Sequence, residues 1–116
     1  MNTEGLNEYE KRAYLAVRRR AISAVNIAIS HAEHPSFNTK TDVVAGFNQV
    51  FDAATLCAEV LDRWHNDTFD VLKYAGVDLY EFQRLRDLYK KDMNRVYNWK
   101  LAHELRSGFR DAIKPE

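Results

Sequence analysis

The chain contains few residues that interrupt helices, with only four glycines and two prolines among 116 residues. So few breakers favour long helices over many short strands. Cys57 is the only cysteine, so an intramolecular disulfide is excluded and a reducing compartment is the simplest fit. No stretch approaches about 18 consecutive apolar residues, so we expect no membrane-spanning helix.

The chain also lacks net charge, because 17 basic residues balance 17 acidic ones. A protein devoted to nucleic acids or membrane surfaces usually carries a basic excess, so this balance disfavours both roles without excluding a local basic face. Residues 1–5 do not combine a basic start with an apolar run, as a signal peptide would. We therefore expect a cytoplasmic protein, and the length predicts a single domain over residues 1–116.

The spacing of apolar residues predicts two long helices in the first half of the chain. The second, over about 42–65, follows a cap at Thr41 or Asp42. Its apolar residues occupy two sides, with Leu56 on the second side, so we expect this helix to lie centrally and touch several neighbours. The first helix covers about 7–32, and its apolar face consists of Tyr14, Val17, Ala21, Ile22, Val25, Ala28, Ile29 and Ala32.

The second half of the chain predicts a short helix over about 68–75 and a further helix over about 79–113. Gly76 suits the left-handed conformation that ends a helix. Asp78 then caps the last helix, with Glu81 three residues later in a capping-box pattern.

The apolar stripe of this last helix turns by about 100° beyond Trp99. Either the helix kinks near residues 97–99, or one straight helix contacts different partners along its length. No proline forces a break there, so we favour a long helix. The predicted fold class is all-α: a helical bundle of three long helices and one short helix.

The segment 70–88 matches the apolar and glycine spacing of a helix-turn-helix, in which Gly76 would permit the tight turn. Leu72 departs from the pattern, because a small residue is usual there, and the helix that follows is longer than a usual recognition helix. A glycine-capped helical hairpin gives the same spacing. Nucleic-acid binding is therefore the alternative function, along a face that could contact phosphates through Tyr80, Arg84, Lys91 and Arg95.

Potential metal ligands occur in incomplete sets. His31 and His34 are three residues apart, and Asp62 precedes His65 by three, a spacing that lets one helix supply two ligands. A two-metal bundle needs a second such pair and further carboxylates. Glu59 and Asp62 resemble half of the acidic motif of all-α nucleotide pyrophosphohydrolases, which also require a Glu-x-x-Glu that this chain lacks. We expect no metal site and no cofactor.

Catalytic groups are also missing from the sequence. Cys57 lies on an apolar stripe, where burial raises the pKa of a thiol and makes it unreactive. His103 and Glu104 are adjacent, so they do not face each other on a helix. The chain has no Gly-rich phosphate loop, no Gly-x-Ser-x-Gly and no Cys-x-x-Cys. We predict a protein that is not an enzyme and has no catalytic residues.

One charged residue is predicted to be buried. Arg18 falls inside the apolar face of the first helix, whereas Arg19 and Arg20 point outward. A buried guanidinium needs a counter-charge unless its head reaches water. We expect Arg18 to pair with a carboxylate on another element.

The C-terminal helix supplies the leading hypothesis for function. It carries more apolar and aromatic surface than three neighbours can cover, and Tyr, Trp and Arg anchor protein interfaces. We expect a small interaction module that binds another protein or itself as a homo-oligomer, as adaptor or inhibitor. Small neutral helical proteins of this kind include accessory proteins of phages and mobile elements. The displaced stripe predicts the partner-binding residues Trp99, Leu101, Leu105 and Phe109.

Overall fold

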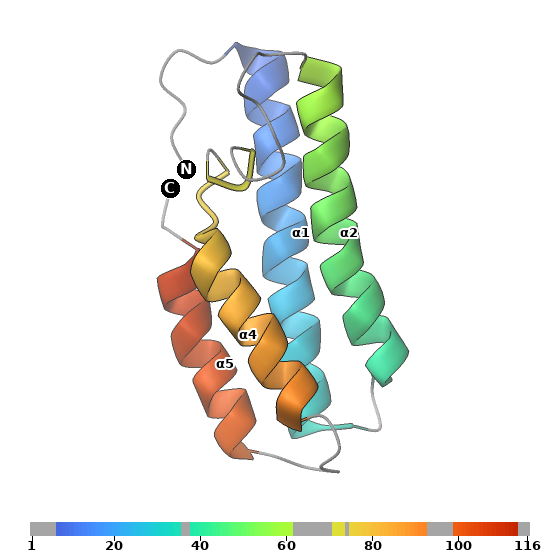
Figure 1. The fold of residues 1–116 in the computed structure, drawn as a ribbon, viewed down its shortest axis with the longest axis vertical. Coiled ribbons are helices and arrows are strands. Elements are labelled where there is room, and N and C mark those ends of the chain that lie inside the picture. The colour runs from blue at the N-terminus through green and yellow to red at the C-terminus, as the bar shows by residue number, and fades with distance from the viewer. Residues whose placement is uncertain (1–6, 36–37, 62–70, 74, 93–98, 114–116) are drawn as a thin grey trace.

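In the part of the chain that the computed structural model describes, four helices form an up-and-down bundle (Figure 1). The described residues are 7–35, 38–61, 71–73, 75–92 and 99–113, with the backbone alone for residues 60, 61, 92, 109 and 112. The all-α prediction is confirmed over these residues. The helices are α1 (Glu8–Glu33), α2 (Lys40–Leu61), α4 (Leu79–Asp92) and α5 (Trp99–Ala112).

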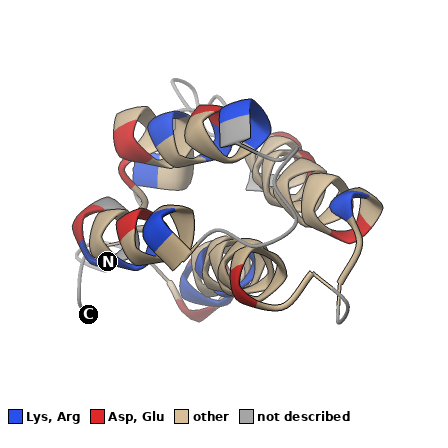
Figure 2. Ribbon diagram, turned by 90° about the horizontal axis from the view of Figure 1, so that it is seen from below, with Lys and Arg blue, Asp and Glu red and all other residues tan. Residues whose placement is uncertain are grey.

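Each helix runs antiparallel to its neighbours around one shared core (Figures 1 and 2). α1 packs against α2 and α5, and α4 packs against α5. α2 and α4 meet through aromatic side chains: the ring of Phe82 lies edge-on to Phe47 and Phe51, with centroids 5.3 and 6.0 Å apart. The bundle measures 45 × 23 × 20 Å, and both basic and acidic residues are distributed over its helices (Figure 2).

Short-range caps fix where the two long helices begin. Asn7 accepts a hydrogen bond from the Glu10 amide at 2.9 Å, and Glu10 accepts one from the Asn7 amide at 3.3 Å. The cap of α2 is Thr39, whose hydroxyl accepts from the Asp42 amide at 3.2 Å, so the predicted cap at Thr41 or Asp42 is wrong. The Asp42 carboxylate accepts hydrogen bonds from the Thr39 amide at 2.7 Å and from the Thr39 hydroxyl at 3.0 Å, and these two bonds lower its pKa.

The predicted last helix, 79–113, is two antiparallel helices, α4 and α5, lying side by side (Figure 1). Val77, before α4, forms an isolated bridge with Ile113, after α5, which places these ends together. The predicted kink at residues 97–99 lies, apart from Trp99, outside the described residues, and the prediction of one long helix is wrong because α5 runs antiparallel to α4. The physical reason is that the hairpin directs both apolar stripes into one core, whereas a straight helix would leave one of them in water.

A hydrogen-bonded glycine turn precedes α4. Gly76 has a φ of 83°, which confirms its predicted left-handed conformation. Its amide donates to the Lys73 carbonyl at 3.1 Å, and the Val77 amide donates to the Leu72 carbonyl at 2.9 Å, the two bonds of a Schellman motif. Residues 71–73 of the predicted helix 68–75 are helical, and the rest of that prediction, apart from Ala75, lies outside the described residues.

α1, rather than α2, is the helix with the most extensive packing. It contacts both α2 and α5, and Arg18 and Glu10 are buried along with its apolar face. The prediction that α2 lies centrally is wrong, because Leu56 on its second apolar side is 59% exposed. The buried apolar residues of α1 are Tyr14, Val17, Ala21, Ala24, Val25, Ala28, Ile29 and Ala32.

A polar contact joins the last turns of α1 and α4. The hydroxyl of Tyr89 shares a hydrogen bond with Nδ1 of His31, and their rings meet edge-to-face with centroids 5.6 Å apart. Tyr89 is almost completely buried, and this burial raises its pKa to about 12. The core therefore holds this tyrosine in its neutral form.

Two helical glycines give a matched pair of stability tests. A Cβ on Gly46 would lie 3.5 Å from the Ala24 Cα, an ordinary contact, so Gly46→Ala should stabilise the protein by about 0.5–1 kcal/mol through helix propensity. A Cβ on Gly108 would overlap Leu85, which is fully buried and has little room to move. Gly108→Ala should therefore lower stability by about 1–2 kcal/mol, since overpacking outweighs the propensity gain. Urea denaturation measures both changes, and a stabilised Gly108→Ala would contradict the close α4–α5 contact.

Tyr89 predicts a loss of stability at high pH. Its pKa in the folded protein, about 12, lies above the ordinary value of 10, so its contribution is complete below pH 10 and disappears as the pH rises toward 12. The free energy of unfolding of the wild type should fall over this interval more steeply than that of Tyr89→Phe. Tyr80→Phe, at an exposed position, is the control and should behave as wild type. Titration of all six tyrosines together near pH 10 in the folded protein would exclude the effect.

Candidate interaction surfaces

The partner surface predicted at the C-terminal end is not assembled in the structure. Leu101 and Leu105 are buried, because α5 directs them toward the core that it shares with α1 and α4. Trp99, at the first residue of α5, is 66% exposed. The side chain of Phe109 lies outside the described residues. The prediction is corrected accordingly: the two leucines stabilise the chain's own core, and only Trp99 among the described three lies at the surface.

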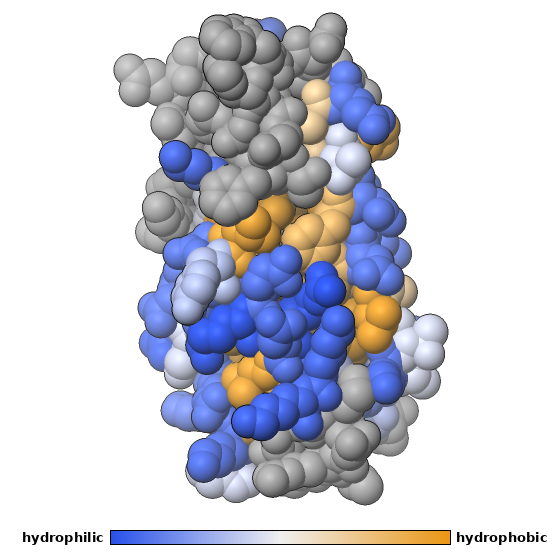
Figure 3. Space-filling model, in the orientation of Figure 1, coloured by the Kyte–Doolittle hydropathy of each residue, from blue (hydrophilic) through white to orange (hydrophobic). Residues whose placement is uncertain are grey.

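The predicted nucleic-acid face of α4 is exposed but carries compensated charge. Tyr80, Arg84 and Lys91 are all exposed, and Arg95 lies outside the described residues. Arg84 donates through Nε to the Glu81 carboxylate at 2.8 Å, and this bond raises the pKa of its guanidinium. Hydrophilic residues gather over α4 (Figure 3). The ion pair leaves less of the Arg84 charge available to a phosphate than the sequence suggests.

An apolar groove of about 240 Å³ lies between α1 and α2. Tyr9 and Leu56 line it and are 60% and 59% exposed. Small side chains form much of the remaining lining, so the groove is a recess between two large apolar residues. The lining residues are Tyr9, Ala13, Ala16, Val17, Arg20, Ala53, Leu56 and Cys57.

Sequence reasoning missed this groove although two signals for it were present. Leu56 defines a second apolar side of α2, which we expected to be covered by a neighbour. Tyr9, Ala13 and Ala16 repeat at helical spacing on α1, outside the face that enters the core. Two large apolar residues, Tyr9 and Leu56, outside the core-facing sides of their helices, together with the alanines near them, could have indicated a surface groove.

Cys57 lies at the inner edge of the same groove. Its side chain is buried, as predicted, and burial raises the pKa of the thiol. A protonated thiol is a poor nucleophile. Cys57 therefore contributes to the groove as a small apolar residue.

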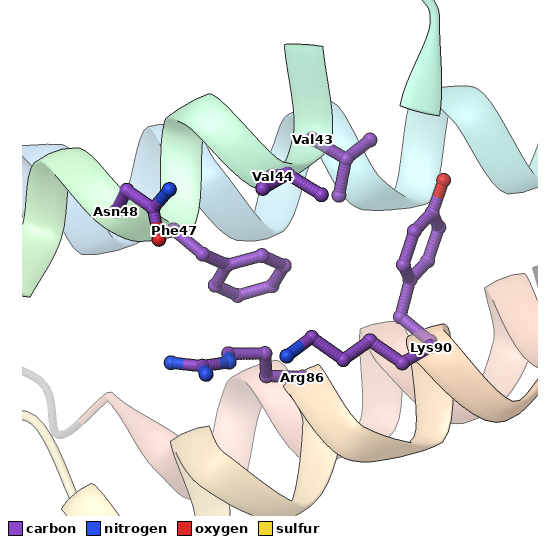
Figure 4. A pocket seen from close by; sticks show the side chains of 7 residues that line it. Val43, Val44, Phe47, Asn48, Arg86 and Lys90 are labelled. Carbon is purple, nitrogen blue, oxygen red and sulfur yellow. The ribbon is translucent and has the colours of Figure 1, made fainter. Parts of the chain in front are cut away.

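A second, much smaller cavity of about 30 Å³ lies between α2 and α4 (Figure 4). Arg86 and Lys90 of α4 lie across from Phe47 and Asn48 of α2. The Arg86 guanidinium also lies 5.3 Å from the centre of the Phe51 ring, a cation–π distance. Because one water needs roughly 10–15 Å³, this cavity admits about two waters and is too small for an organic ligand.

A polar groove of about 460 Å³ lies between α1 and α5. Three of its side chains, His103, Arg106 and Arg110, repeat along one side of α5 and can donate hydrogen bonds. Arg106 forms an ion pair with Glu33 of α1. Among the described residues the lining consists of Asn26, Ile29, His103, Arg106, Ser107 and Arg110, none of which is acidic.

The remaining candidate residues either contact other parts of the fold or lie outside the described residues. Arg18 is buried as predicted and donates to the Ala75 carbonyl at 3.5 Å, while its pairing with a carboxylate stays a prediction. His31 bonds to Tyr89, as described above, and His34 occupies the C-cap of α1. Asp62 and His65 lie outside the described residues.

The described residues include neither a metal-binding cluster nor a membrane-spanning helix. No group of three or more His, Cys, Asp or Glu in the described ranges is arranged to hold a metal ion. None of the described helices is long and apolar enough to cross a membrane.

Comparison with known proteins leaves the surfaces themselves as the basis for assigning a function. No protein-family model, no curated protein and no solved structure matches the chain.

Proposed function

We propose that this protein is a non-enzymatic interaction module that self-associates through the groove between α1 and α2. The observation that carries the proposal is the exposure of Tyr9 and Leu56, each more than half accessible, beside an alanine-rich surface. Burying a fully exposed large apolar side chain contributes about 1.5–3 kcal/mol, and covering the exposed part of Tyr9 or Leu56 contributes the corresponding fraction. In a symmetric dimer both subunits bury the same residue, so each such contribution to the free energy of association occurs twice.

A second copy of the chain is the partner that best fits this surface. An isologous interface uses the same patch on both subunits, so the patch must contain both projections and recesses. Leu56 and Tyr9 project, while Ala13, Ala16 and Ala53 leave room for a projection from the other copy. The chain carries no net charge, so two copies approach without overall repulsion. An adaptor or inhibitor role would use the exposed surface of the dimer, such as Trp99.

Replacing Leu56 by glutamate tests the proposal. The wild type should elute as a dimer in size-exclusion chromatography with light scattering. Leu56→Glu should be monomeric, since the change removes apolar burial and adds the cost of desolvating a carboxylate. Because Leu56 is exposed in the single chain, the variant should keep the helical circular dichroism of the wild type.

Trp99→Glu is the matched control, because Trp99 is similarly exposed but lies outside the groove. This variant should remain dimeric. A wild type that stays monomeric up to its solubility limit would refute the proposal, as would a Leu56→Glu variant that dimerises like the wild type.

Nucleic-acid binding is a second candidate function, favoured by the lining of the α1–α5 groove. His103, Arg106 and Arg110 extend over two turns of α5 with polar Asn26 opposite them. Phosphate oxygens accept hydrogen bonds from these residue types, and contacts of this kind fix a protein on a nucleic-acid backbone. Arg106 pairs with Glu33 as Arg84 pairs with Glu81, so we prefer this groove to the face of α4 because His103 and Arg110 line it together with Arg106.

The salt dependence of binding distinguishes the two basic surfaces. If the wild type binds a short DNA or RNA duplex, Arg106→Ala/Arg110→Ala should reduce the slope of log K against log salt by roughly 2, about 1 per lost contact. Arg84→Ala/Lys91→Ala, which removes the same formal charge from α4, should leave the slope nearly unchanged. A wild type that binds neither duplex at low salt removes this second candidate.

A further inference from the structure

The two walls of the α1–α2 groove carry opposite charge. Arg20 lines the groove on α1, and Arg12 and Arg19 are exposed next to it, three residues after the lining residues Tyr9 and Ala16. On α2, Asp52 and Glu59 are exposed, four residues before and three residues after Leu56. Residues three or four apart share one side of a helix, so each charged pair borders the groove on its own helix. Beyond Lys40, α2 contains no Lys or Arg at all.

This charge separation distinguishes the two ways in which the groove can meet itself. If the two-fold axis crosses the helices, α1 faces α1 of the second copy, and the arginines oppose one another. If the axis runs parallel to the helices, α1 faces α2 of the second copy, and arginines oppose carboxylates twice. Like charges held together at an interface oppose association, so the parallel axis is favoured.

The register between α1 and α2 brings the opposite charges to matching heights. Ala24 and Gly46 lie side by side, since a Cβ on Gly46 would be 3.5 Å from the Ala24 Cα. With a rise of about 1.5 Å per residue, Arg19 and Asp52 lie about 8 and 9 Å from this level toward the same end of the bundle. By the same count, Arg12 and Glu59 lie about 18 and 20 Å from it.

A two-fold axis parallel to the helices preserves height along the bundle. We infer that two copies pack about such an axis, with Arg12 of each opposite Glu59 of the other and Arg19 opposite Asp52. In the same arrangement Leu56 reaches the height of Ala13 and Ala16 of the second copy, where the groove offers small side chains. The inference rests on the proposed self-association and adds its orientation and the residues that set it.

Complementary charge reversal tests this orientation. Arg12→Glu/Arg19→Glu and Asp52→Lys/Glu59→Lys should each weaken homodimerisation by at least about tenfold, because every cross-pair becomes like-charged. An equimolar mixture of the two variants should form a heterodimer with wild-type affinity to within about tenfold, since all four cross-pairs regain opposite charge. Light scattering and native mass spectrometry measure the species present.

The control is Lys90→Glu/Lys91→Glu, which reverses two exposed charges on α4 outside the groove and should leave the dimer intact. Circular dichroism confirms folding of every variant. The orientation is overturned if both groove variants dimerise as wild type, or if their mixture forms no heterodimer. It is also overturned if Arg12→Glu/Arg19→Glu binds the wild type more tightly than the wild type binds itself, as an α1–α1 contact requires. If Leu56→Glu loses the dimer but the charge-reversal variants dimerise as wild type, the proposed self-association stands and only the orientation is removed.

Discussion

The apolar face of α1 is the contact on which the other surfaces depend. Its valines and alanines are almost completely buried, and their small size lets α2 approach closely enough for Gly46 to lie against Ala24. Because α1 packs against α2 on one side and α5 on the other, it forms one wall of both large grooves. Any change that displaces α1 therefore alters the apolar groove and the basic groove together.

The hairpin of α4 and α5 completes the core that α1 and α2 leave open. Its helices approach at Gly108, where a side chain would overlap Leu85, and its first and last residues meet at the Val77–Ile113 bridge. At the opposite end, Tyr89 bonds to His31 and fixes α4 to the end of α1. These contacts join elements that are distant in sequence and so hold the grooves in one geometry.

Zero net charge conceals a division of charge between neighbouring helices. The arginines of α1 and the carboxylates of α2 border one apolar groove, so the charge pattern and the exposed residues Tyr9 and Leu56 occur on the same surface. Apolar burial supplies the free energy of an interface, whereas flanking charges select its orientation. A single surface with both features accounts for self-association more economically than the C-terminal stripe, whose leucines Leu101 and Leu105 stabilise the core.

The sequence by itself determined the all-α fold, the start of α1, the glycine turn at Gly76 and the burial of Arg18, because caps and periodicity act over a few residues. Only the tertiary structure decided that residues 79–92 and 99–112 form a hairpin, because both arrangements satisfy the same local preferences and differ in the core that they bury. For the same reason the periodicity placed Leu56 on a second apolar side of α2 but could not show whether a neighbour covers that side. Its exposure follows from the position of α2 at one corner of the bundle, which local sequence preferences do not specify.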